Sequence, residues 1–391
     1  MIEDAIHRLQ RLIEFPSVSN VSNEAVSREV ADQLEAMGFE VEWTNYYDLA
    51  GTLKCNVIGR RLPKTKHEPR QIGGLAYFGH TDVVPVNDWV GPPIVATDED
   101  NDAFKPLIHN GRLYGRGACD MKGSIAAMIA AAASIPIESQ TQPLWIVCTA
   151  DEEVAFCGAR QMVAKSNYYR DIVAAQPLAI IGEPTSRQVV HGHKGIATLR
   201  ITSHGRAAHS STDEGINAND AMVPMLSLLR DIAAQTRQEK AYHNAAFDPP
   251  HLSWNYGCSD FMTAVNITPP RCVAWANLRT MPGVDGEDLI ERVRTKANEL
   301  GLEFQRFQGG LPVWVEPDEP FLKELSEITH SQPSVVCYGT DGSEYHELNH
   351  RVVLGPGSIE QAHTNDEWIS LDELDRGTKL FTELIQKYCG S

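Results

Sequence analysis

The apolar run LWIVCTA at residues 144–150 constrains the fold of this chain more than any other segment. A strand with apolar side chains on both faces has to be covered on both faces, which is typical of the centre of a parallel sheet. A second run of this kind follows at 178–181, and an Ala-rich helix pattern at 123–135 precedes the first. Strands that alternate with helices predict an α/β domain with a mostly parallel central sheet flanked by helices.

The N-terminal and C-terminal stretches belong to the same kind of domain. Apolar residues recur every three or four positions over 2–13, which predicts a helix that ends before Phe15-Pro16. A second helix is predicted over 26–37, with Gly38 as its C-terminal cap. The further predicted elements are strands at 40–43, 56–59, 74–79 and 352–354 and helices at 321–329 and 371–388.

The pattern changes after the segment GEPTS, at 182–186. From 189 to 308 the order strand, strand, helix, strand, strand, helix predicts a small α+β domain of the ferredoxin-like kind. Its strands are expected at 195–202, 263–267 and 273–279, and its helices at 217–235 and 287–300. We therefore predict a catalytic domain formed by residues 1–188 and 309–391, with the domain at 189–308 inserted into it.

The net charge restricts the classes of binding partner, and the cysteine content bears on the cellular compartment. The chain carries 34 Lys and Arg against 52 Asp and Glu, a net charge of −18. Nucleic acids and anionic membranes bind positive faces, so this balance argues against both. No stretch approaches the roughly 20 apolar residues of a membrane span, and the acidic start Met1-Ile2-Glu3-Asp4 does not resemble a signal peptide. Eight cysteines without a C-x-x-C pair favour buried reduced thiols in a cytoplasmic protein.

Five polar motifs hold most of the residues that could do chemistry, and they follow apolar strands. They are GHTDVVP (79–85), GRGACDMKG (115–123), TADEEVAFCG (149–158), IIGEPTS (181–187) and GPGSIEQAHTNDE (355–367). In an open α/β sheet the carboxyl ends of the strands line the ligand crevice. The side chains expected to meet there are His80, Asp82, Asp120, Glu152, Glu153, Glu183 and His363.

The acids of this set predict bound cations. The carboxylates of Asp82, Asp120, Glu152, Glu153 and Glu183 sum to −5. Close like charges raise pKa values and cost stability unless cations neutralise them. Mixed imidazole and carboxylate ligands suit Zn²⁺, and also Co²⁺ or Mn²⁺. Two divalent cations balance three ligand carboxylates and one hydroxide, and one of the two remaining acids is then available as a base.

The spacing within two motifs suggests individual roles. His80 and Asp82 face the same side of an extended segment, so Asp82 is placed to hold the ring nitrogen of His80 that does not bind metal. Glu152 and Glu153 are adjacent and diverge from the backbone. One can therefore bind a metal while the other acts as a general base toward a metal-activated water.

Together these motifs resemble the dinuclear-zinc amidohydrolase and peptidase family that includes acetylornithine deacetylase, succinyl-diaminopimelate desuccinylase, aminoacylase and glutamate carboxypeptidase. The resemblance spans nearly the whole chain and implies a role for each residue. By resemblance His80 and Glu183 bind one metal, Glu153 and His363 bind the other, Asp120 bridges both, Glu152 is the general base and Asp82 supports His80. The resemblance also implies a cis peptide bond between Asp120 and Met121.

The inserted domain resembles the lid and dimerisation domain of that family, which implies a homodimer. In the motif GRAAHSS the resemblance places His209 in the active site of the neighbouring subunit, where it stabilises the developing oxyanion. In AVNITP it places Asn266 near the substrate. In ANLRT it makes Arg279 the clamp on a substrate carboxylate, a task that suits a guanidinium fork.

The substrate is inferred from two C-terminal segments. GPGSIEQAHTNDEWIS and YGTDGSEYHEL look most like acetylornithine deacetylases, and the loop 340–344 lacks the arginine typical of desuccinylases. Asp341 or Glu344 could instead meet a cationic side-chain amine. We therefore expect hydrolysis of N2-acetyl-L-ornithine to L-ornithine and acetate, a step in arginine biosynthesis. The alternatives are desuccinylation of N-succinyl-diaminopimelate and a broader N-acyl-amino-acid hydrolase.

Three readings of other kinds fit the sequence less well. The string GRGACDMKGS lacks the residue order of a phosphate loop or a dinucleotide fingerprint. Cys119 as a thiol nucleophile has no accompanying His and Asn pattern. A metal-binding scaffold without catalysis would have no need of Glu152.

Overall fold

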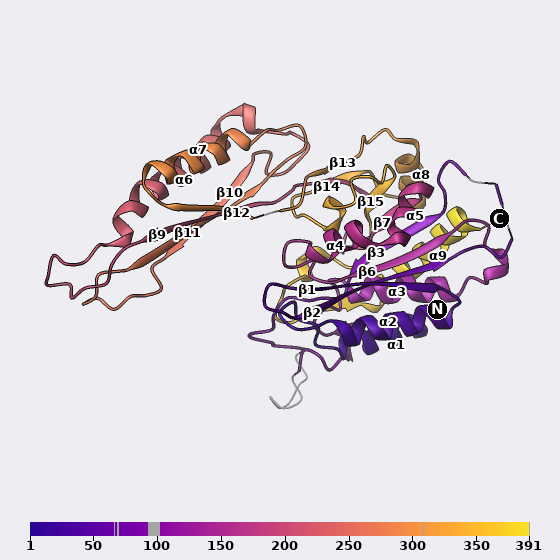
Figure 1. Ribbon diagram of the computed structural model, residues 1–391. Coiled ribbons are helices and arrows are strands. Elements are labelled where there is room, and N and C mark those ends of the chain that lie inside the picture. The colour runs from indigo at the N-terminus through magenta and orange to yellow at the C-terminus, as the bar shows by residue number, and fades with distance from the viewer. Residues whose placement is uncertain (66, 69, 93–101, 308, 391) are drawn as a thin grey trace. The chain divides into compact units, whose positions relative to one another are not determined.

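The computed structural model describes residues 1–391 except 66, 69, 93–101, 308 and 391 (Figure 1). The chain divides into two compact units. The first comprises residues 1–192, 315–334 and 340–391, and the second comprises 193–314 and 335–339. Relative to the predicted boundaries at 189 and 308, the second unit begins at 193, continues to 314 and also takes in 335–339.

The first unit is built on a sheet whose central strands run parallel (Figure 1). Starting at one edge, the order is β1 (Glu40–Tyr47), β2 (Leu53–Arg61), β6 (Leu144–Thr149), β3 (Leu75–His80), β7 (Leu178–Ile181), β15 (Arg351–Val353) and β8 (Val190–His193). The strands β6, β3, β7 and β15 pair in parallel, and the other pairs are antiparallel. Every residue of β3, β6 and β7 is buried. The α/β class expected from the apolar runs is confirmed.

Both faces of this sheet are covered. On one face α1 (Ile2–Ile13), α3 (Lys122–Ala133) and α9 (Leu371–Cys389) pack together, and Tyr77 of β3 lies 5.6 Å from Phe381 between ring centroids. The next strand residue, Phe78, packs against Tyr345 at 4.2 Å on the other face. The remaining helices of the unit are α2 (Glu24–Ala36), α4 (Cys157–Lys165), α5 (Asn167–Ala175) and α8 (Pro320–Thr329).

Three short strands lie outside the central sheet. The strands β4 (Leu107–His109), β5 (Arg112–Tyr114) and β16 (Trp368–Ser370) form a separate three-stranded sheet in the order β16-β5-β4. Two more short strands, β13 (Val313–Trp314) and β14 (Ser334–Val336), belong with β8 to the larger sheet. The small sheet matters for the site because the segments on either side of β5 and β16 carry Asp120 and His363.

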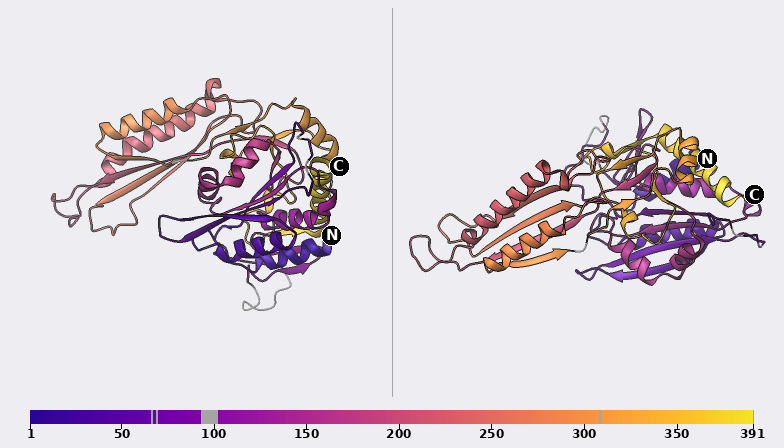
Figure 2. Two further views of the ribbon diagram at one scale, coloured as in Figure 1. Left: turned by 45° about the vertical axis from the view of Figure 1, so that its right-hand side comes forward. Right: turned by 90° about the horizontal axis from the view of Figure 1, so that it is seen from above.

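The second unit has the strand and helix order of a ferredoxin-like domain. Its elements are β9 (Ala197–His204), α6 (Ala218–Gln238), β10 (Ser253–Ser259), β11 (Arg271–Arg279), α7 (Glu287–Glu299) and β12 (Glu303–Phe307). They form an antiparallel sheet in the order β10-β11-β9-β12. Figure 2 shows both helices on one face of this sheet. Alternate residues of β11 are buried beneath them, as a one-sided sheet requires.

One predicted strand of the inserted domain is wrong. In the described structure 263–267 forms no strand, and Ile267 makes only an isolated bridge to His209. Val265 is fully exposed and Pro269-Pro270 follow, so the segment has neither a buried face nor continuous amide donors. The strand between α6 and β11 is instead β10, whose sequence SWNYGCS has no clear alternation of apolar and polar residues.

Two further expectations from the sequence concern the state of the cysteines and the absence of a membrane-spanning helix. All eight cysteines lie within the described residues as free thiols, and Cys55, Cys119, Cys148, Cys272 and Cys389 are buried. No helix of the described residues is both long enough and apolar enough to cross a membrane.

Candidate metal centre

The polar motifs meet at one edge of the central sheet. The neighbouring strands β3, β6 and β7 end at or just before His80, Glu152, Glu153 and Glu183. These strands are parallel, so their carboxyl ends share one edge, which is where ligands bind in open α/β sheets. Asp120 reaches it from the loop before α3, and His363 reaches it from the segment before β16.

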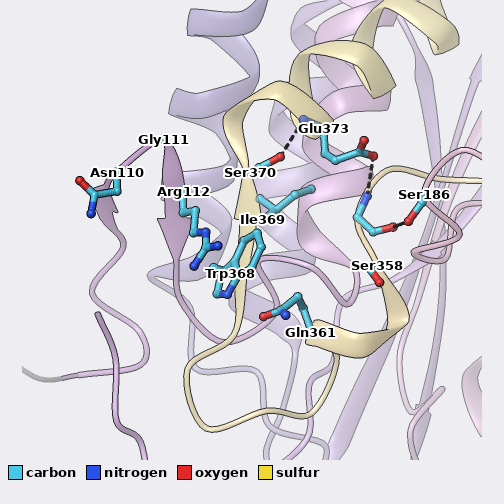
Figure 3. Close-up of a pocket in the computed structure, with 11 residues that line it drawn as sticks. Asn110, Gly111, Arg112, Ser186, Ser358, Gln361, Trp368, Ile369, Ser370 and Glu373 are labelled. Atoms are coloured by element: carbon cyan, nitrogen blue, oxygen red, sulfur yellow. Dashed lines mark hydrogen bonds between the residues drawn. The ribbon is translucent and has the colours of Figure 1, made fainter. Parts of the chain in front are cut away.

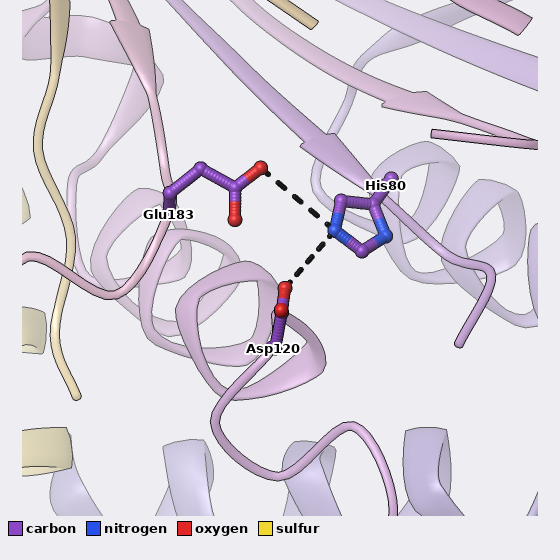
Figure 4. A group of neighbouring side chains, drawn as sticks. All are labelled: His80, Asp120 and Glu183. Carbon is purple, nitrogen blue, oxygen red and sulfur yellow. Dashed lines mark hydrogen bonds and ion pairs between the residues drawn. The ribbon is translucent and has the colours of Figure 1, made fainter. Parts of the chain in front are cut away.

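His80, Asp120 and Glu183 form a first group of candidate ligands (Figure 4). Nε2 of His80 lies 3.2 Å from Oδ1 of Asp120 and 3.8 Å from Oε1 of Glu183. All three residues are buried. One imidazole and two carboxylates make a donor set that Zn²⁺ and related divalent ions accept.

Asp120, Glu153 and His363 form a second group. Nε2 of His363 lies 3.0 Å from Oε1 of Glu153 and 3.4 Å from Oδ2 of Asp120. The two oxygens of Asp120 therefore face two different histidines. Within each group the candidate ligand atoms lie within 4.8 Å of one another, so each group could hold one cation with Asp120 shared between them.

Glu152 forms a third group with His80 and Glu153, whose candidate ligand atoms also lie within 4.8 Å of one another. Burial raises the pKa of the Glu152 carboxyl well above its ordinary value; His80 opposes this, and the nearby Glu183 and Glu153 add to it. Burial also raises the pKa of Glu183 well above its ordinary value. Buried acids this close repel one another when ionised, and divalent cations would remove that repulsion.

The pKa of the Asp120 carboxyl is shifted in the opposite direction. Burial raises the pKa of its carboxyl, but hydrogen bonds from His363 and His80 outweigh burial and hold it below its ordinary value. A carboxylate that stays ionised between two imidazoles is suited to cations on both sides. The peptide bond from Asp120 to Met121 is cis, as the family resemblance implies.

Asp82 contacts both His80 and the turn that carries Glu152 and Glu153. Nδ1 of His80 lies 2.9 Å from the main-chain oxygen of Asp82 and 3.6 Å from its Oδ1, so the closer partner is the carbonyl. The carboxylate accepts hydrogen bonds from the amides of Glu152 at 3.1 Å and Glu153 at 3.3 Å, and from Ser19 Oγ at 2.8 Å. Asp82 therefore also orients the turn that carries the two glutamates.

A buried ion pair that the sequence did not predict supports this turn. Nζ of Lys54 lies 2.8 Å from Oδ1 of Asp151, and the hydroxyl of Tyr46 donates to Oδ2 at 2.7 Å. Asp151 has a φ of 54°, an uncommon conformation for a non-glycine residue, directly before Glu152. The sequence signal for this ion pair was the position of Lys54 near the start of the strand sequence LKCNVIGRR, and its side chain is only 1% exposed.

Asp341 and Glu344 lie in the first unit with protein partners of their own. Oδ2 of Asp341 accepts from Thr149 Oγ1 at 2.6 Å, and burial raises its pKa to about 7. Oε1 of Glu344 accepts from Arg160 at 2.7 Å. Neither belongs to a ligand group. A substrate amine would have to compete with Thr149 or Arg160 to contact them.

The other three predicted residues lie in the second unit. His209 is exposed and hydrogen bonds through Nδ1 to Ser211 Oγ at 2.7 Å. The loops that carry His209 and Asn266 lie side by side, because the amide of Ser210 donates to the oxygen of Asn266 at 3.0 Å. Arg279 is the last residue of β11.

Cys119 does not have the environment of a nucleophile. Its side chain is buried, and Sγ donates to the oxygen of Ser358 at 3.2 Å. Burial raises the pKa of this thiol well above its ordinary value, with Glu367 and Asp120 adding to the effect. The reactive species of a cysteine is the thiolate, so this environment disfavours nucleophilic catalysis.

A pocket of about 300 Å³ lies next to the last motif (Figure 3). Arg112 stacks over Trp368 at 3.8 Å, and Glu373 accepts from the amide of Gly357 at 3.4 Å. None of the residues predicted to do chemistry lines this pocket. It is therefore a feature apart from the candidate metal centre.

Comparison with known proteins places the chain in a family. Residues 76–387 match the family described as Peptidase family M20/M25/M40. The chain belongs to this family. Among its relatives, the acetylornithine deacetylases of Proteus mirabilis (strain HI4320) and Photorhabdus laumondii subsp. laumondii are 32% and 31% identical to it. Each alignment covers 98% of this chain, and 96% and 97% of the respective relative.

Solved structures show that the fold of this M20 member is shared at low identity. The yeast (Saccharomyces cerevisiae) dipeptidase Dug1p has a TM-score of 0.72 at 16% identity, covering 99% of this chain and 96% of its own. The M20 metallo-carboxypeptidase Sso-CP2 from Sulfolobus solfataricus has a TM-score of 0.70 at 17% identity, covering 98% and 99%. The family resemblance expected from the motifs is confirmed, and the chain is a metal-dependent hydrolase of amide bonds.

Proposed function

We propose that this M20 member is an acetylornithine deacetylase that uses two divalent cations. Zn²⁺ is the preferred candidate for both, and Co²⁺ and Mn²⁺ are the alternatives. The observation that carries the proposal is the position of Asp120 between two donor groups, each with one histidine. A carboxylate with one oxygen toward each group suits two ions better than one. Full-length identity of 31–32% to enzymes named acetylornithine deacetylase supports the substrate.

The mechanism assigns a task to each side chain. The residues proposed to hold the cations are His80 and Glu183 on one side, Glu153 and His363 on the other, and Asp120 between them. Bound cations supply Lewis acidity, which polarises an amide carbonyl and makes water more acidic. Glu152 takes the proton of the attacking water and passes it to the amide nitrogen. The C–N bond then breaks, and acetate and the free α-amine leave.

The second unit is proposed to complete the site and to form the homodimer. His209 of one subunit would stabilise the oxyanion in the other, while Asn266 and Arg279 would contact the substrate. Exposed apolar side chains on this unit support association: Phe261 is 58% exposed, Met262 93% and Val265 101%. Apolar groups gathered on a surface are typical of an interaction site.

A mixed dimer tests whether His209 acts across the subunit boundary. His209→Ala and Glu152→Gln chains are each expected to be nearly inactive alone. After denaturation and joint refolding, random pairing is expected to restore about one quarter of the wild-type rate, because half the dimers hold one intact site. The rate of acetylornithine hydrolysis measures this. No recovery, with dimers present by size-exclusion chromatography, would place His209 within one chain or remove its role.

Three substrates separate the proposed function from its alternatives. We expect kcat/KM for N2-acetyl-L-ornithine to exceed that for N-succinyl-diaminopimelate by about 10²-fold or more, because a site without a partner for the distal carboxylate leaves it desolvated and unpaired. N-acetyl-L-methionine tests the broader hydrolase. A reversed order would establish the alternative substrate. Stoichiometric metal with turnover of none of the three would favour a metal-binding scaffold.

A further inference from the structure

The carboxylate of Glu367 is the hydrogen-bond acceptor for the loop that carries Asp120. Oε2 accepts from Nη1 of Arg116 at 2.7 Å and from the amide of Gly117 at 3.0 Å. Oε1 accepts from the amide of Cys119 at 2.8 Å and from the amide of Asp120 itself at 3.0 Å. The side chain is 1% exposed, so water does not share these bonds.

The loop depends on this acceptor because it lies between a strand and a helix and has no regular pattern of backbone hydrogen bonds of its own. It runs from the end of β5 to the start of α3, and Gly117 has a φ of 83°. A Cβ on Gly117 would lie 2.8 Å from Cγ1 of Val83, so the main chain is pressed against the interior. Buried amides need partners. Three amides of this loop, those of Gly117, Cys119 and Asp120, converge on one anion and form a concave anion-binding arrangement, with Glu367 as the anion.

Glu367 also ties this loop to the segment that carries His363. It follows His363 by four residues and directly precedes β16, which pairs with β5 through Trp368 and Tyr114. The main-chain oxygen of Glu367 accepts from the amide of Gly115 at 3.1 Å. One short segment therefore supplies a candidate ligand, His363, and the group that holds another.

We propose that Glu367 is a positioning residue that holds Asp120 between His80 and His363, where one carboxylate can serve two cations. The inference rests on the proposed function, which makes Asp120 the shared ligand. Glu367 does not itself bind a cation in this scheme, because both of its oxygens are occupied by loop donors. It acts on the metals through the position of Asp120 alone.

Replacing Glu367 by Gln tests the proposal with little change in shape. Glutamine has one acceptor oxygen, so its NH₂ group must face two of the four donors. We expect the Zn²⁺ affinity of the folded metal-free protein, measured by competition with a chromogenic chelator, to fall by about 10–100-fold. At saturating Zn²⁺ we expect kcat for acetylornithine to fall more than KM changes.

Glu373→Gln is the matched control. Glu373 also accepts from an arginine, Arg187 Nη2 at 2.6 Å, and from a main-chain amide, Gly357, but that amide belongs to no candidate ligand (Figure 3). This variant should lower the melting temperature without changing Zn²⁺ affinity. Glu367→Asp keeps the charge yet is too short to reach all four donors, so it should fall between wild type and Glu367→Gln.

The outcomes separate a positioning role from a structural one. Folded Glu367→Gln with wild-type Zn²⁺ affinity and kcat would overturn the proposal, even if its melting temperature fell. Failure of both Glu367 variants to fold would also overturn it, because the residue would then serve the fold as a whole. Wild-type protein that binds no Zn²⁺ or hydrolyses none of the substrates would instead refute the proposed function.

Discussion

Replacing Glu152 by Gln is expected to leave both cations bound and to lower kcat by about 10²–10⁴-fold. Glutamine has nearly the same shape but cannot take a proton from water or return it to the leaving amine. Burial and neighbouring acids raise the pKa of the Glu152 carboxyl, which brings it nearer to the working pH of a base. Metal analysis and steady-state kinetics with acetylornithine measure the two effects separately.

Glu138→Gln controls for the loss of one acidic group. Glu138 is an exposed residue whose carboxylate pairs with Lys64, and it belongs to no group of candidate ligands. This variant should keep wild-type kcat. Near-full activity of Glu152→Gln would remove Glu152 from the role of general base. Loss of metal together with activity would instead make it a ligand.

Removing the cations is expected to lower the melting temperature by roughly 10 °C. A ligand at a thousand times its Kd stabilises the folded state by about 4 kcal/mol, and each kcal/mol shifts the midpoint of a domain of this size by about 2–4 °C. The cause is the repulsion between the neighbouring carboxylates of Asp120, Glu153 and Glu183 once no cation lies between them. Thermal melting before and after exhaustive chelation and dialysis measures the change.

The metal-free protein should also be more sensitive to pH. Burial raises the pKa of Glu152 and Glu183 in the folded state. A raised folded pKa gives stability that is present below the unfolded value of about 4.3 and is lost as pH rises toward the folded value. The metal-free protein should therefore lose stability between pH 5 and 8 faster than the loaded protein.

Asp120→Asn provides the control for chelation, because it removes the proposed shared ligand. Its melting temperature should respond little to chelator. An unchanged melting temperature of the wild-type protein after verified metal removal would count against a shared cation cluster. Equal pH slopes for the two forms would count against repulsion among the acids as the cause.

The apolar runs of β3, β6 and β7 made the catalytic unit predictable. A strand that is apolar on both faces can be stable only when both faces are covered, so its place in the centre of an α/β sheet follows from hydrophobicity alone. The motifs that follow such strands must then share an edge, and His80 and Glu183 do lie 3.8 Å apart between Nε2 and Oε1.

The inserted domain was harder to predict because its sheet has one exposed face. The segment 263–267 has β-branched residues but leaves Val265 and Ile267 exposed, whereas β10 pairs with β11 along its whole length despite its mixed sequence. Whether such a segment becomes a strand depends on what lies opposite, and a single segment does not contain that information.

The fold class, the family and the identity of the residues gathered at the sheet edge follow from the sequence, because apolar runs and polar motifs are contained in short segments. Tertiary structure alone decided how those residues are held. Glu367 bonds to amides some 250 residues earlier in the chain, as its contact with Gly117 shows. Lys54 meets Asp151 from a strand 97 positions earlier in the sequence. Hydrogen bonds act over about 3 Å, so such partners exist only once the chain has brought them together.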